Sequence, residues 1–420
     1  MRDEDRSLLE EMFAAAVKAA EPGAAMAGVL PERPRGRVVV VGAGKGVAQM
    51  AAAFETAWGA PVEGIVVTRY GFGAPTRYVQ VLEAAHPVPD EAGVRAGEAL
   101  LEAVSGLGED DLVVALVCGG GSALLAAPSA GLTLADEVEL NEALLASGAP
   151  IGAMNAIRKQ LSRVKGGRLA AAAFPAKVVS LIVSDVPGDD PAQVASGPTV
   201  PDKVGRAEAL AAVAAYGIAL PERIRAALEL AEAPPAPDDP VFARNEVHVI
   251  ASAAKSLEAA AEVARGGGYT PVILSDAIEG EAREVAKVHA AIAREVRHRG
   301  RPFAAPVAIL SGGETSVTLR TKGGRGGRNS EFLLSLAQGI EGLEHVAAMA
   351  ADTDGIDGSE DNAGAFADGS TAARMRAAGI DPGAALAGHD AWGAFAAVGE
   401  LFVPGPTGTN VNDLRVMLIR

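Results

Sequence analysis

The chain is poor in cysteine and histidine. Cys118 is its single cysteine, so neither an internal disulfide nor a cysteine-based zinc site can form. Its six histidines lie scattered, without the spacing of metal ligands. These absences favour a reducing compartment, and we expect a cytoplasmic protein. The acidic start, Met1 to Arg6, leads into an amphipathic helix pattern and does not predict a signal peptide.

Positive charge is also scarce, because 37 Lys and Arg face 53 Asp and Glu, for a net charge of −16. This balance argues against nucleic acid and anionic membranes as partners and favours small-molecule substrates; a monomer and a homodimer both stay open. Long apolar runs are lacking as well. The longest uncharged stretch, 112–135, is broken by Gly119-Gly-Gly-Ser122 and by Pro128, which predicts a strand, a turn and a helix start instead of a membrane span.

The few cations gather in two acid-free clusters. Residues 155–168 hold five of them, and residues 320–328 hold four. On a background that repels anions, such clusters suit small polyanions, for example a nucleotide together with a carboxylate.

The spacing of apolar runs predicts two α/β domains. In the first half, strand-length runs alternate with helix-length patterns, which indicates βαβ units and a Rossmann-like, doubly wound parallel sheet. These runs are 38–41, 64–68, 78–82, 112–117 and 178–183. Four prolines in residues 231–240 mark a linker, which gives one domain over 1–235 and a second, smaller one over 241–420.

The second half predicts a mixed sheet. Its strand-length runs are 247–251, 271–274, 307–310, 316–319, 346–350 and 416–419. Residues 307–310 and 316–319 are separated by only five residues and look like a hairpin, which would place antiparallel strands beside parallel ones.

Two glycine turns follow predicted strands of the first domain. Residues 38–46 run from a strand into Gly44-Lys45-Gly46, a setting in which backbone N–H groups and a helix N-terminus bind an anion. The turn lacks the P-loop spacing, and Val47 takes the third glycine position of the dinucleotide fingerprint. A tight strand–helix corner is an equally good interpretation, although Lys45 favours a site. Residues 118–124 repeat the arrangement with Ser122, and the ends of parallel strands would bring both turns to one crevice.

A helix predicted from about Met154 carries a one-sided polar stripe. Its members at helical spacing are Asn155, Arg158, Ser162 and Lys165. A solvated face is the simple interpretation, yet such a face normally mixes charges of both signs and this one has only cations. An anion-facing helix explains the stripe better.

The loop 184–190 collects carboxylates after a predicted strand. It is either an ordinary turn or the source of a catalytic base or magnesium ligand, with Asp189 and Asp185 as the candidates.

Two segments of the second domain suit phosphate binding. Glu314 lies in the Ser-Gly-Gly-Glu-Thr segment 311–315, and the glycine loop that follows contains Arg325, Arg328 and Asn329. Arginines in a glycine loop suit a bidentate clamp on phosphate oxygens, which a merely flexible loop does not need.

The acidic segment 351–361 follows a predicted strand and fails the EF-hand pattern. Asp352 and Asp354 could hold a Mg²⁺ on a nucleotide; a solvated turn is an equally good interpretation.

Taken in order, these segments resemble the glycerate 2-kinase family, whose C-terminal part is the MOFRL domain and some of whose members carry the older name hydroxypyruvate reductase. The similarity covers nearly the whole chain, with many separate motifs in the same order. The matching segments are 41–45, 85–90, 118–124, 155–169, 184–189, 196–199, 311–315, 326–331, 352–358 and 407–414.

The resemblance implies ATP- and Mg²⁺-dependent phosphorylation of D-glycerate on its 2-hydroxyl, in a cleft between a Rossmann-like domain and a smaller α/β (MOFRL) domain. It also implies key roles for the lysine of the glycine turn, here Lys45, and for an arginine of the second glycine loop. That arginine is Arg328, with Arg325 as a near-repeat three residues earlier.

On this basis we expect Lys45, with Arg158 or Lys165, to hold the glycerate carboxylate or a transferring oxygen, and Arg328 to steady the γ-phosphate. Asp189 or Asp185 would accept the hydroxyl proton, and Asp352 or Asp354 would bind Mg²⁺. The remaining expected binding residues are Gly44, Ser122, Asn155, Glu314, Arg325 and Asn329. The rival hypotheses are an NAD(P)H-dependent hydroxypyruvate reductase and a non-catalytic binding protein for a nucleotide or an organic acid.

Overall fold

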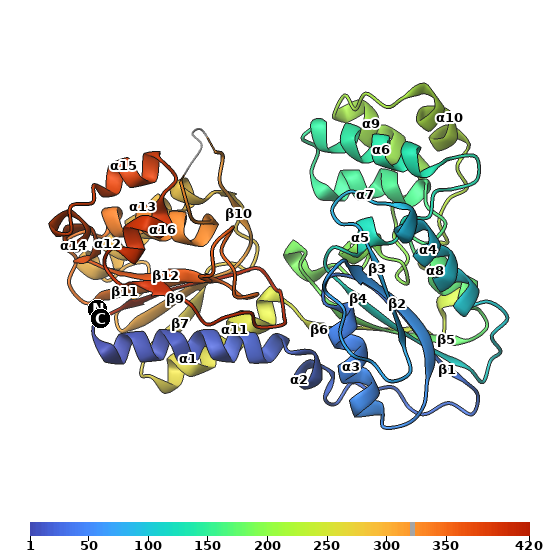
Figure 1. Cartoon of the computed structure of the whole chain (residues 1–420), viewed down its shortest axis with the longest axis horizontal. Helices are drawn as coiled ribbons and strands as arrows, with labels where there is room; N and C mark the ends of the chain where they lie inside the picture. Colours follow the sequence, from blue (N-terminus) through green and yellow to red (C-terminus); the bar gives the residue numbers. More distant parts are fainter. Residues whose placement is uncertain (320–323) are drawn as a thin grey trace. The chain divides into compact units, whose positions relative to one another are not determined.

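The computed structural model describes residues 1–319 and 324–420. Its contacts divide the chain into a first unit, residues 25–250, and a second unit, residues 1–24 together with 251–420 (Figure 1). The predicted domain bounds, 1–235 and 241–420, differ from this division at both ends. Helix α1 (Asp3–Ala20) packs in the second unit, and the proline-rich segment 231–240 lies inside the first, because one more strand of the first sheet follows it.

The first sheet has the strand order β3-β2-β1-β4-β5-β6. Its strands are β1 (Val38–Ala43), β2 (Glu63–Arg69), β3 (Gln80–Ala84), β4 (Leu112–Cys118), β5 (Lys177–Val183) and β6 (Glu246–Ala251). Neighbouring strands from β3 to β5 pair in parallel, so the doubly wound sheet is confirmed, with its winding reversed between β1 and β4. Residues 247–251 were expected in the second sheet; that assignment is wrong, since they belong to β6.

Helices cover the first sheet because its strands are apolar along their length, and every residue of β4 is buried. Leu100 and Leu169 from two of these helices pack against Val41 and Ala115 of the strands. The helices from residue 22 to residue 230 are α2 (Pro22–Met26), α3 (Val47–Trp58), α4 (Glu91–Ala103), α5 (Gly121–Leu124), α6 (Leu134–Ala146), α7 (Ile151–Gln160), α8 (Arg168–Ala173), α9 (Arg206–Ala215) and α10 (Glu222–Leu230). Of these, α6, α7, α9 and α10 surround a separate small core.

The second sheet has the order β13-β12-β11-β14-β9-β7. Its strands are β7 (Thr270–Ile273), β9 (Val307–Ser311), β11 (Val346–Asp352), β12 (Gly364–Asp368), β13 (Leu401–Phe402) and β14 (Asp413–Ile419). The β7–β9 pair is parallel and the other pairs are antiparallel, so the mixed sheet is confirmed.

The predicted hairpin of 307–310 and 316–319 is wrong. Strand β9 already lies between β14 and β7, so both of its edges are paired. Strand β10 (Thr315–Ser316) pairs in parallel with β8 (Gly280–Glu281) instead.

Side chains of β11 alternate between two cores, as the period of a strand requires. Ala348 and Ala350 face the core of α12 (Ala282–Arg299) and α13 (Arg328–Gly339), whereas Met349 and Ala351 face the core of α1 and α11 (Ala253–Gly266). This second core explains why α1 belongs here, because its apolar face covers a side of the sheet that would otherwise be exposed. The remaining helices are α14 (Thr371–Ala377), α15 (Pro382–Ala387) and α16 (Ala391–Ala396).

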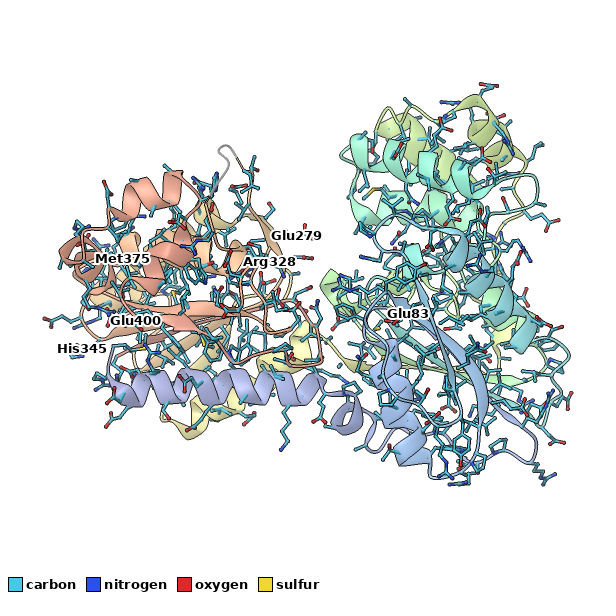
Figure 2. All side chains as sticks on the ribbon, in the orientation of Figure 1. Glu83, Glu279, Arg328, His345, Met375 and Glu400 are labelled. Carbon is cyan, nitrogen blue, oxygen red and sulfur yellow. The ribbon has the colours of Figure 1, made fainter. Side chains whose placement is uncertain are left out.

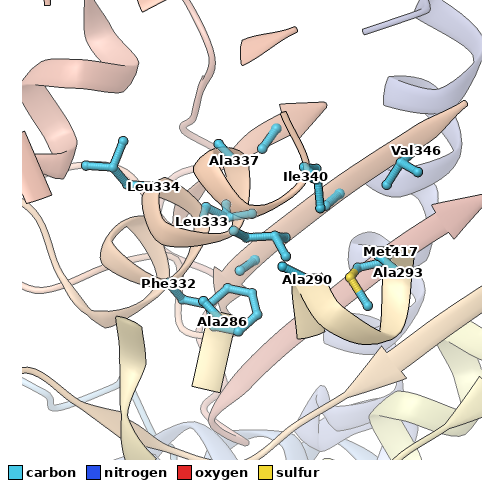
Figure 3. Packing of buried hydrophobic residues seen from close by; sticks show 14 of the residues in the cluster. Ala286, Ala290, Ala293, Phe332, Leu333, Leu334, Ala337, Ile340, Val346 and Met417 are labelled. Atoms are coloured by element: carbon cyan, nitrogen blue, oxygen red, sulfur yellow. The ribbon is translucent and has the colours of Figure 1, made fainter. Parts of the chain in front are cut away.

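Figure 3 shows the first of these cores, where α13 packs beside α12. Phe332 lies next to Ala286, and small alanines on α12 let the two helices approach closely. This packing holds the N-terminus of α13, where Arg328 begins the helix, over the end of the sheet.

Over residues 1–319 and 324–420, no helix combines the length and the apolar character needed to cross a bilayer.

Replacing Phe332 by Ala is expected to destabilise the second unit. The Phe332 ring is 1 % exposed, and its centroid lies 5.1 Å from that of the His289 imidazole. The truncation leaves a cavity, at a cost of about 3–5 kcal/mol in the free energy of unfolding. Urea unfolding followed by circular dichroism measures the loss. Val288→Ala, at an exposed position of α12, is the control, and equal losses in the two variants would contradict the packing argument.

Candidate functional site

Four loops of the first unit reach the same edge of its sheet, because β3, β2, β1 and β4 are parallel neighbours. A polar side chain stands at the end of each strand or within four residues after it. From β3 to β4 these residues are His86, Arg69, Lys45 and Ser122. The strand order therefore brings together the two glycine turns that the sequence placed at one edge.

The Lys45 turn is clamped onto the second glycine turn. The Lys45 N–H donates to the carbonyl of Gly119 over 2.9 Å, and the Thr68 hydroxyl donates to the carbonyl of Lys45 over 2.9 Å. Gly44 has φ +143°, and a Cβ there would overlap the side chain of Cys118, so glycine is required. These contacts fix the position from which the Lys45 side chain projects.

Cys118 is a packing residue under this turn. It is buried, the Gly46 N–H donates to its Sγ over 3.3 Å, and burial raises the pKa of the thiol to about 12. A thiol that is so hard to ionise is not a nucleophile at neutral pH.

Lys45 and His86 lie together over Gly120. A Cβ on Gly120 would be 2.9 Å from Cγ of Lys45, 3.0 Å from its Cε and 3.1 Å from Nε2 of His86. Burial, and then the charges of Lys45 and Arg69, lower the pKa of His86 to about 4, so the imidazole is neutral at pH 7. Sequence reasoning quoted His86 within the motif 85–90 but gave it no role. The available signal was a histidine placed directly after a strand.

Asp185 lies against the same pair of turns. A Cβ on Gly119 would overlap the carboxylate of Asp185, and both Asp185 and Lys45 act on the pKa of Cys118. Asp189, by contrast, belongs to the short 3-10 turn Pro187–Asp189, where it has φ +54°. Of the two candidate bases, Asp185 is the one that the structure places beside the Lys45 turn.

A chain of polar contacts joins Ser122 to Asn155 and Arg158. The hydroxyls of Ser122 and Ser196 are 2.9 Å apart, and Ser196 donates to Oδ1 of Asn155 over 3.2 Å. Arg158 donates to the same oxygen over 3.1 Å. Ala195 and Ser196 are held at φ +51° and +61°, a strained conformation that is typical of functional sites. Three predicted residues are thus brought together, with Ser196 as an additional member.

The predicted anion-facing helix is wrong beyond Gln160. Helix α7 ends there, and the left-handed Gly166 and Gly167 separate it from α8. Ser162 and Lys165 are therefore not on one helical face with Asn155 and Arg158.

Lys165 is instead part of a buried ion pair. It is 2 % exposed, and its Nζ donates to Oε1 of Glu137 and to the carbonyl of Leu125, both over 3.1 Å. Lys159 is likewise buried and paired with Asp202. Pairing with acids that are distant in sequence explains why the cations of this segment looked unopposed.

Arginines and carboxylates gather at one edge of the second sheet. Strand β11 ends at Asp352, and its antiparallel neighbour β14 begins at Asp413, directly opposite. Arg415 lies opposite Ser311 at the end of β9, and α13 begins at Arg328 (Figure 2).

Arg328 is held by three carboxylates. Its Nε donates to Oδ1 of Asp413 over 2.8 Å, and its Nη2 donates to Oδ2 of Asp352 over 2.6 Å. Its Nη1 lies 3.3 Å from Oε1 of Glu314, whose side chain is 58 % exposed. Burial lowers the pKa of Arg328, but the three carboxylates raise it by more, so the side chain stays protonated. Burial also raises the pKa of Asp352 well above its usual range, although the Arg328 charge opposes this shift.

Arg325 lies apart from this cluster. It is exposed, its guanidinium carbon is 4.0 Å from the centre of the Trp392 ring, and its Nε is 4.0 Å from Oδ1 of Asp390. Of the near-repeated arginines, Arg328 is therefore the one among the carboxylates. Arg320 and Lys322 of the predicted basic cluster lie outside the described residues.

The N-terminus of α13 is fixed by two acids. Asp357 accepts the N–H groups of Asn329 and Ser330 over 2.9 and 2.8 Å, which satisfies the first turn of the helix. Nδ2 of Asn329 donates to Oδ1 of Asp413 over 2.7 Å, and Asn329 is fully buried. Asn329 thus holds the carboxylate that binds Arg328.

Arg415 supports the cluster from the interior. It is 1 % exposed and donates to the carbonyl of Gly312 over 2.9 Å and to the Thr315 hydroxyl over 3.2 Å. It also forms an ion pair with Oδ2 of Asp413, whose Oδ1 binds Arg328. Sequence reasoning quoted Asp413 within the segment 407–414 but gave it no role, and it missed Arg415. Their signal is a pair of opposite charges inside an apolar strand that the structure buries completely.

The chemistry of this edge fits a Mg²⁺ that arrives with a nucleotide. Over residues 1–319 and 324–420, no group of three or more His, Cys, Asp or Glu is arranged to hold a metal. Mg²⁺ bound to phosphates needs only one or two protein carboxylates. Asp354 is partly buried and accepts the Ile356 N–H over 2.8 Å, and its own N–H donates to Asp352. Asp354 and Asp352 thus supply such carboxylates at the end of β11.

Two family descriptions match the chain. Residues 8–229 match the domain of unknown function DUF4147, and residues 307–413 match the MOFRL family.

The chain is also similar to named relatives. It is 40 % identical to the D-glycerate 2-kinase of Thermotoga maritima, over 99 % of this chain and 98 % of the relative. It is 54 % identical to an Agrobacterium vitis protein with the provisional name hydroxypyruvate reductase, over 99 % and 94 %. The crystal structure of the Thermotoga maritima glycerate kinase, 39 % identical, superposes over the whole of both chains with a TM-score of 0.91.

Asp413→Ala is expected to lower the free energy of unfolding by about 3–5 kcal/mol, because it leaves Arg415 and Arg328 without a buried partner. Denaturant unfolding of the variant beside the parent measures the change. Asp361→Ala, at an exposed position of the same unit, is the control. A loss below about 1 kcal/mol in Asp413→Ala would show that the arginines do not depend on this carboxylate.

Proposed function

The chain belongs to the glycerate kinase family that combines DUF4147 and MOFRL domains, and from this premise we propose the reaction of a glycerate 2-kinase. The enzyme transfers the γ-phosphate of ATP to the 2-hydroxyl of D-glycerate and forms 2-phosphoglycerate and ADP. The observation that carries this conclusion is the similarity, over 99 % of the chain, to a named D-glycerate 2-kinase, together with the shared fold of a glycerate kinase. It is a phosphotransferase with an alcohol group as acceptor.

One observation favours a hydroxypyruvate reductase, namely the provisional name of the Agrobacterium vitis relative. Some members of the same family carry that name, but the first glycine turn of this chain argues against a reductase. Val47 occupies the third glycine position of the dinucleotide fingerprint, and β2 ends in Thr68-Arg69 where an acid for the ribose is expected.

Phosphoryl transfer depends on positioning and on charge neutralisation more than on covalent chemistry. In the first unit, Lys45 supplies a positive charge at the sheet edge from a backbone that the Gly44 turn holds still. Ser122, Asn155 and Arg158 add hydrogen-bonding groups from one connected network. Lys165 keeps its ion pair with Glu137 and supports this region from the interior.

In the second unit, Arg328 presents Nη1 to phosphate. Its Nε and Nη2 are anchored by the buried Asp413 and Asp352, whereas Nη1 faces the exposed Glu314 at a longer 3.3 Å. An incoming phosphate oxygen replaces Glu314 at this nitrogen and leaves the other two contacts intact. The guanidinium is therefore oriented before the negative charge of the transition state develops.

Mg²⁺ is proposed to accompany the nucleotide, with Asp354 and Asp352 as the residues that hold it. When bound, it neutralises phosphate charge. The two carboxylates also explain how an acidic edge accepts a polyanion, since the cation and the phosphates bind there together.

The proton of the 2-hydroxyl is proposed to pass to Asp185. Its carboxylate lies against Gly119, whose carbonyl accepts the Lys45 N–H. Asp189, the first choice from the sequence, lies further along the same loop. We further propose a cytoplasmic reaction, in line with the single buried cysteine.

Lys45→Ala and Arg328→Ala are each expected to lower kcat/KM for D-glycerate by about 100-fold or more, which corresponds to about 2.7 kcal/mol of transition-state stabilisation. The physical reason is the loss of a positive charge that opposes the developing negative charge. Steady-state kinetics with D-glycerate and ATP measure both variants.

The matched controls are Lys203→Ala in the first unit and Arg376→Ala in the second, both at exposed positions. A kcat/KM within about twofold of the parent for either Lys45→Ala or Arg328→Ala would remove that residue from the mechanism.

ADP formation is expected to require D-glycerate strictly, and the product is expected to feed enolase directly. Because enolase acts on 2-phosphoglycerate, the coupled absorbance signal should appear with enolase alone. A signal that needs added phosphoglycerate mutase would indicate transfer to the 3-hydroxyl instead. NADH oxidation on addition of hydroxypyruvate, without ADP formation, would support the reductase.

A further inference from the structure

Of the polar side chains at the first sheet edge, His86 and Arg69 have no task in the proposed mechanism, and His86 is the one that lies beside Lys45. It follows β3, as Arg69 ends β2 and Lys45 follows β1, so three nitrogen-bearing side chains stand on adjacent parallel strands. It is partly buried.

The local geometry directs Lys45 and His86 to the same space. Cε of Lys45 and Nε2 of His86 would be 3.0 and 3.1 Å from one Cβ on Gly120. Gly120 has no such atom, and its φ of +78° disfavours any other residue. The missing Cβ therefore lets the Lys45 side chain and the His86 ring lie close together over the Gly120 backbone.

The backbone next to these two side chains is held by local contacts. The Thr68 hydroxyl binds the Lys45 carbonyl, and the Arg69 guanidinium stacks on the Phe72 ring at 3.5 Å. The Ala85 N–H donates to Oδ1 of Asp90, which places the residue before His86. These contacts fix the backbone positions from which Lys45 and His86 project.

The chemistry of the pair suits a carboxylate that carries an adjacent hydroxyl. The ammonium of Lys45 matches the charge of the carboxylate. A neutral imidazole nitrogen both accepts from and donates to a hydroxyl, according to its tautomer. Burial of the ring, and then the charges of Lys45 and Arg69, lower its pKa and keep it in this neutral form at pH 7.

We propose that His86 contacts the substrate and recognises the 2-hydroxyl of D-glycerate, while Lys45 binds the carboxylate. This inference rests on the proposed function and makes the Lys45–His86 pair the subsite of the hydroxy acid and not of the nucleotide.

Calorimetric titration of the full chain without nucleotide tests the contact, with D-glycerate and with 3-hydroxypropionate, which lacks the 2-hydroxyl. The parent is expected to bind D-glycerate more tightly. His86→Ala is expected to raise the Kd for D-glycerate about tenfold and to leave the Kd for 3-hydroxypropionate within about twofold, because one hydrogen bond is lost. His86→Gln, which places an amide near the position of Nε2, is expected to restore part of the preference for D-glycerate over 3-hydroxypropionate.

His248→Ala, a partly exposed histidine of β6 in the same unit, is the control and should match the parent. If His86→Ala raised the Kd for D-glycerate and the Kd for 3-hydroxypropionate by the same factor, the proposal would be overturned. Such a result would mean that the ring supports the site without contacting the 2-hydroxyl. A raised KM for ATP with an unchanged Kd for D-glycerate would overturn it as well.

The two hypotheses fail separately. If the parent phosphorylates D-glycerate and His86→Ala still binds D-glycerate more tightly than 3-hydroxypropionate by the full factor, the role of His86 is refuted. The proposed kinase activity is then unaffected. If the preference for D-glycerate over 3-hydroxypropionate depends on His86 but the protein forms no ADP, the subsite is supported and the proposed kinase activity is refuted.

Discussion

The burial of both sheets on both faces is the constraint on which the rest of the structure depends. Strands β4 and β14 are buried along their whole length, so a charged side chain on them must be paired or must stand at a strand end. Lys45 follows β1, Asp352 ends β11 and Asp413 begins β14. The polar groups of each unit are therefore collected at a sheet edge, and this makes two edges chemically distinct from the rest of the surface.

Charge pairing decides which cations remain available to a ligand. The chain has a net charge of −16, yet several of its cations are already matched inside the protein. Lys165 is bound to Glu137, and Arg415 is bound to Asp413. A buried pair of this kind contributes little to net stability but orients its members strongly, because either one alone would be an uncompensated charge. Arg328 is partly matched and partly available to a ligand. Two of its nitrogens are held by buried carboxylates, and the third faces the exposed Glu314.

Sequence periodicity predicted most of the framework but little of the pairing. Apolar runs located β1, β4 and β5 because buried parallel strands are apolar throughout, and the glycine turns after β1 and β4 followed from the same pattern. The prediction for Lys165 was wrong, because the sequence does not show that this cation pairs with Glu137, 28 residues earlier. His86 and Arg415 were missed because their roles depend on neighbours from other strands. The proline-rich segment gave a plausible boundary, but chain composition does not reveal which sheet the next strand joins.

The neutrality of His86 has a catalytic meaning if the pair with Lys45 binds the hydroxy acid. Two full positive charges on the substrate carboxylate would stabilise the bound substrate and the transition state alike, and such uniform binding lowers KM without raising kcat. The carboxylate keeps its charge throughout the reaction, whereas the 2-hydroxyl oxygen changes as it loses its proton and attacks phosphorus. A single ammonium suffices for the unchanging group, and a neutral ring beside it interacts with the atom that reacts. Burial, and then the charges of Lys45 and Arg69, lower the pKa of His86, and the two side chains therefore take different tasks at one sheet edge.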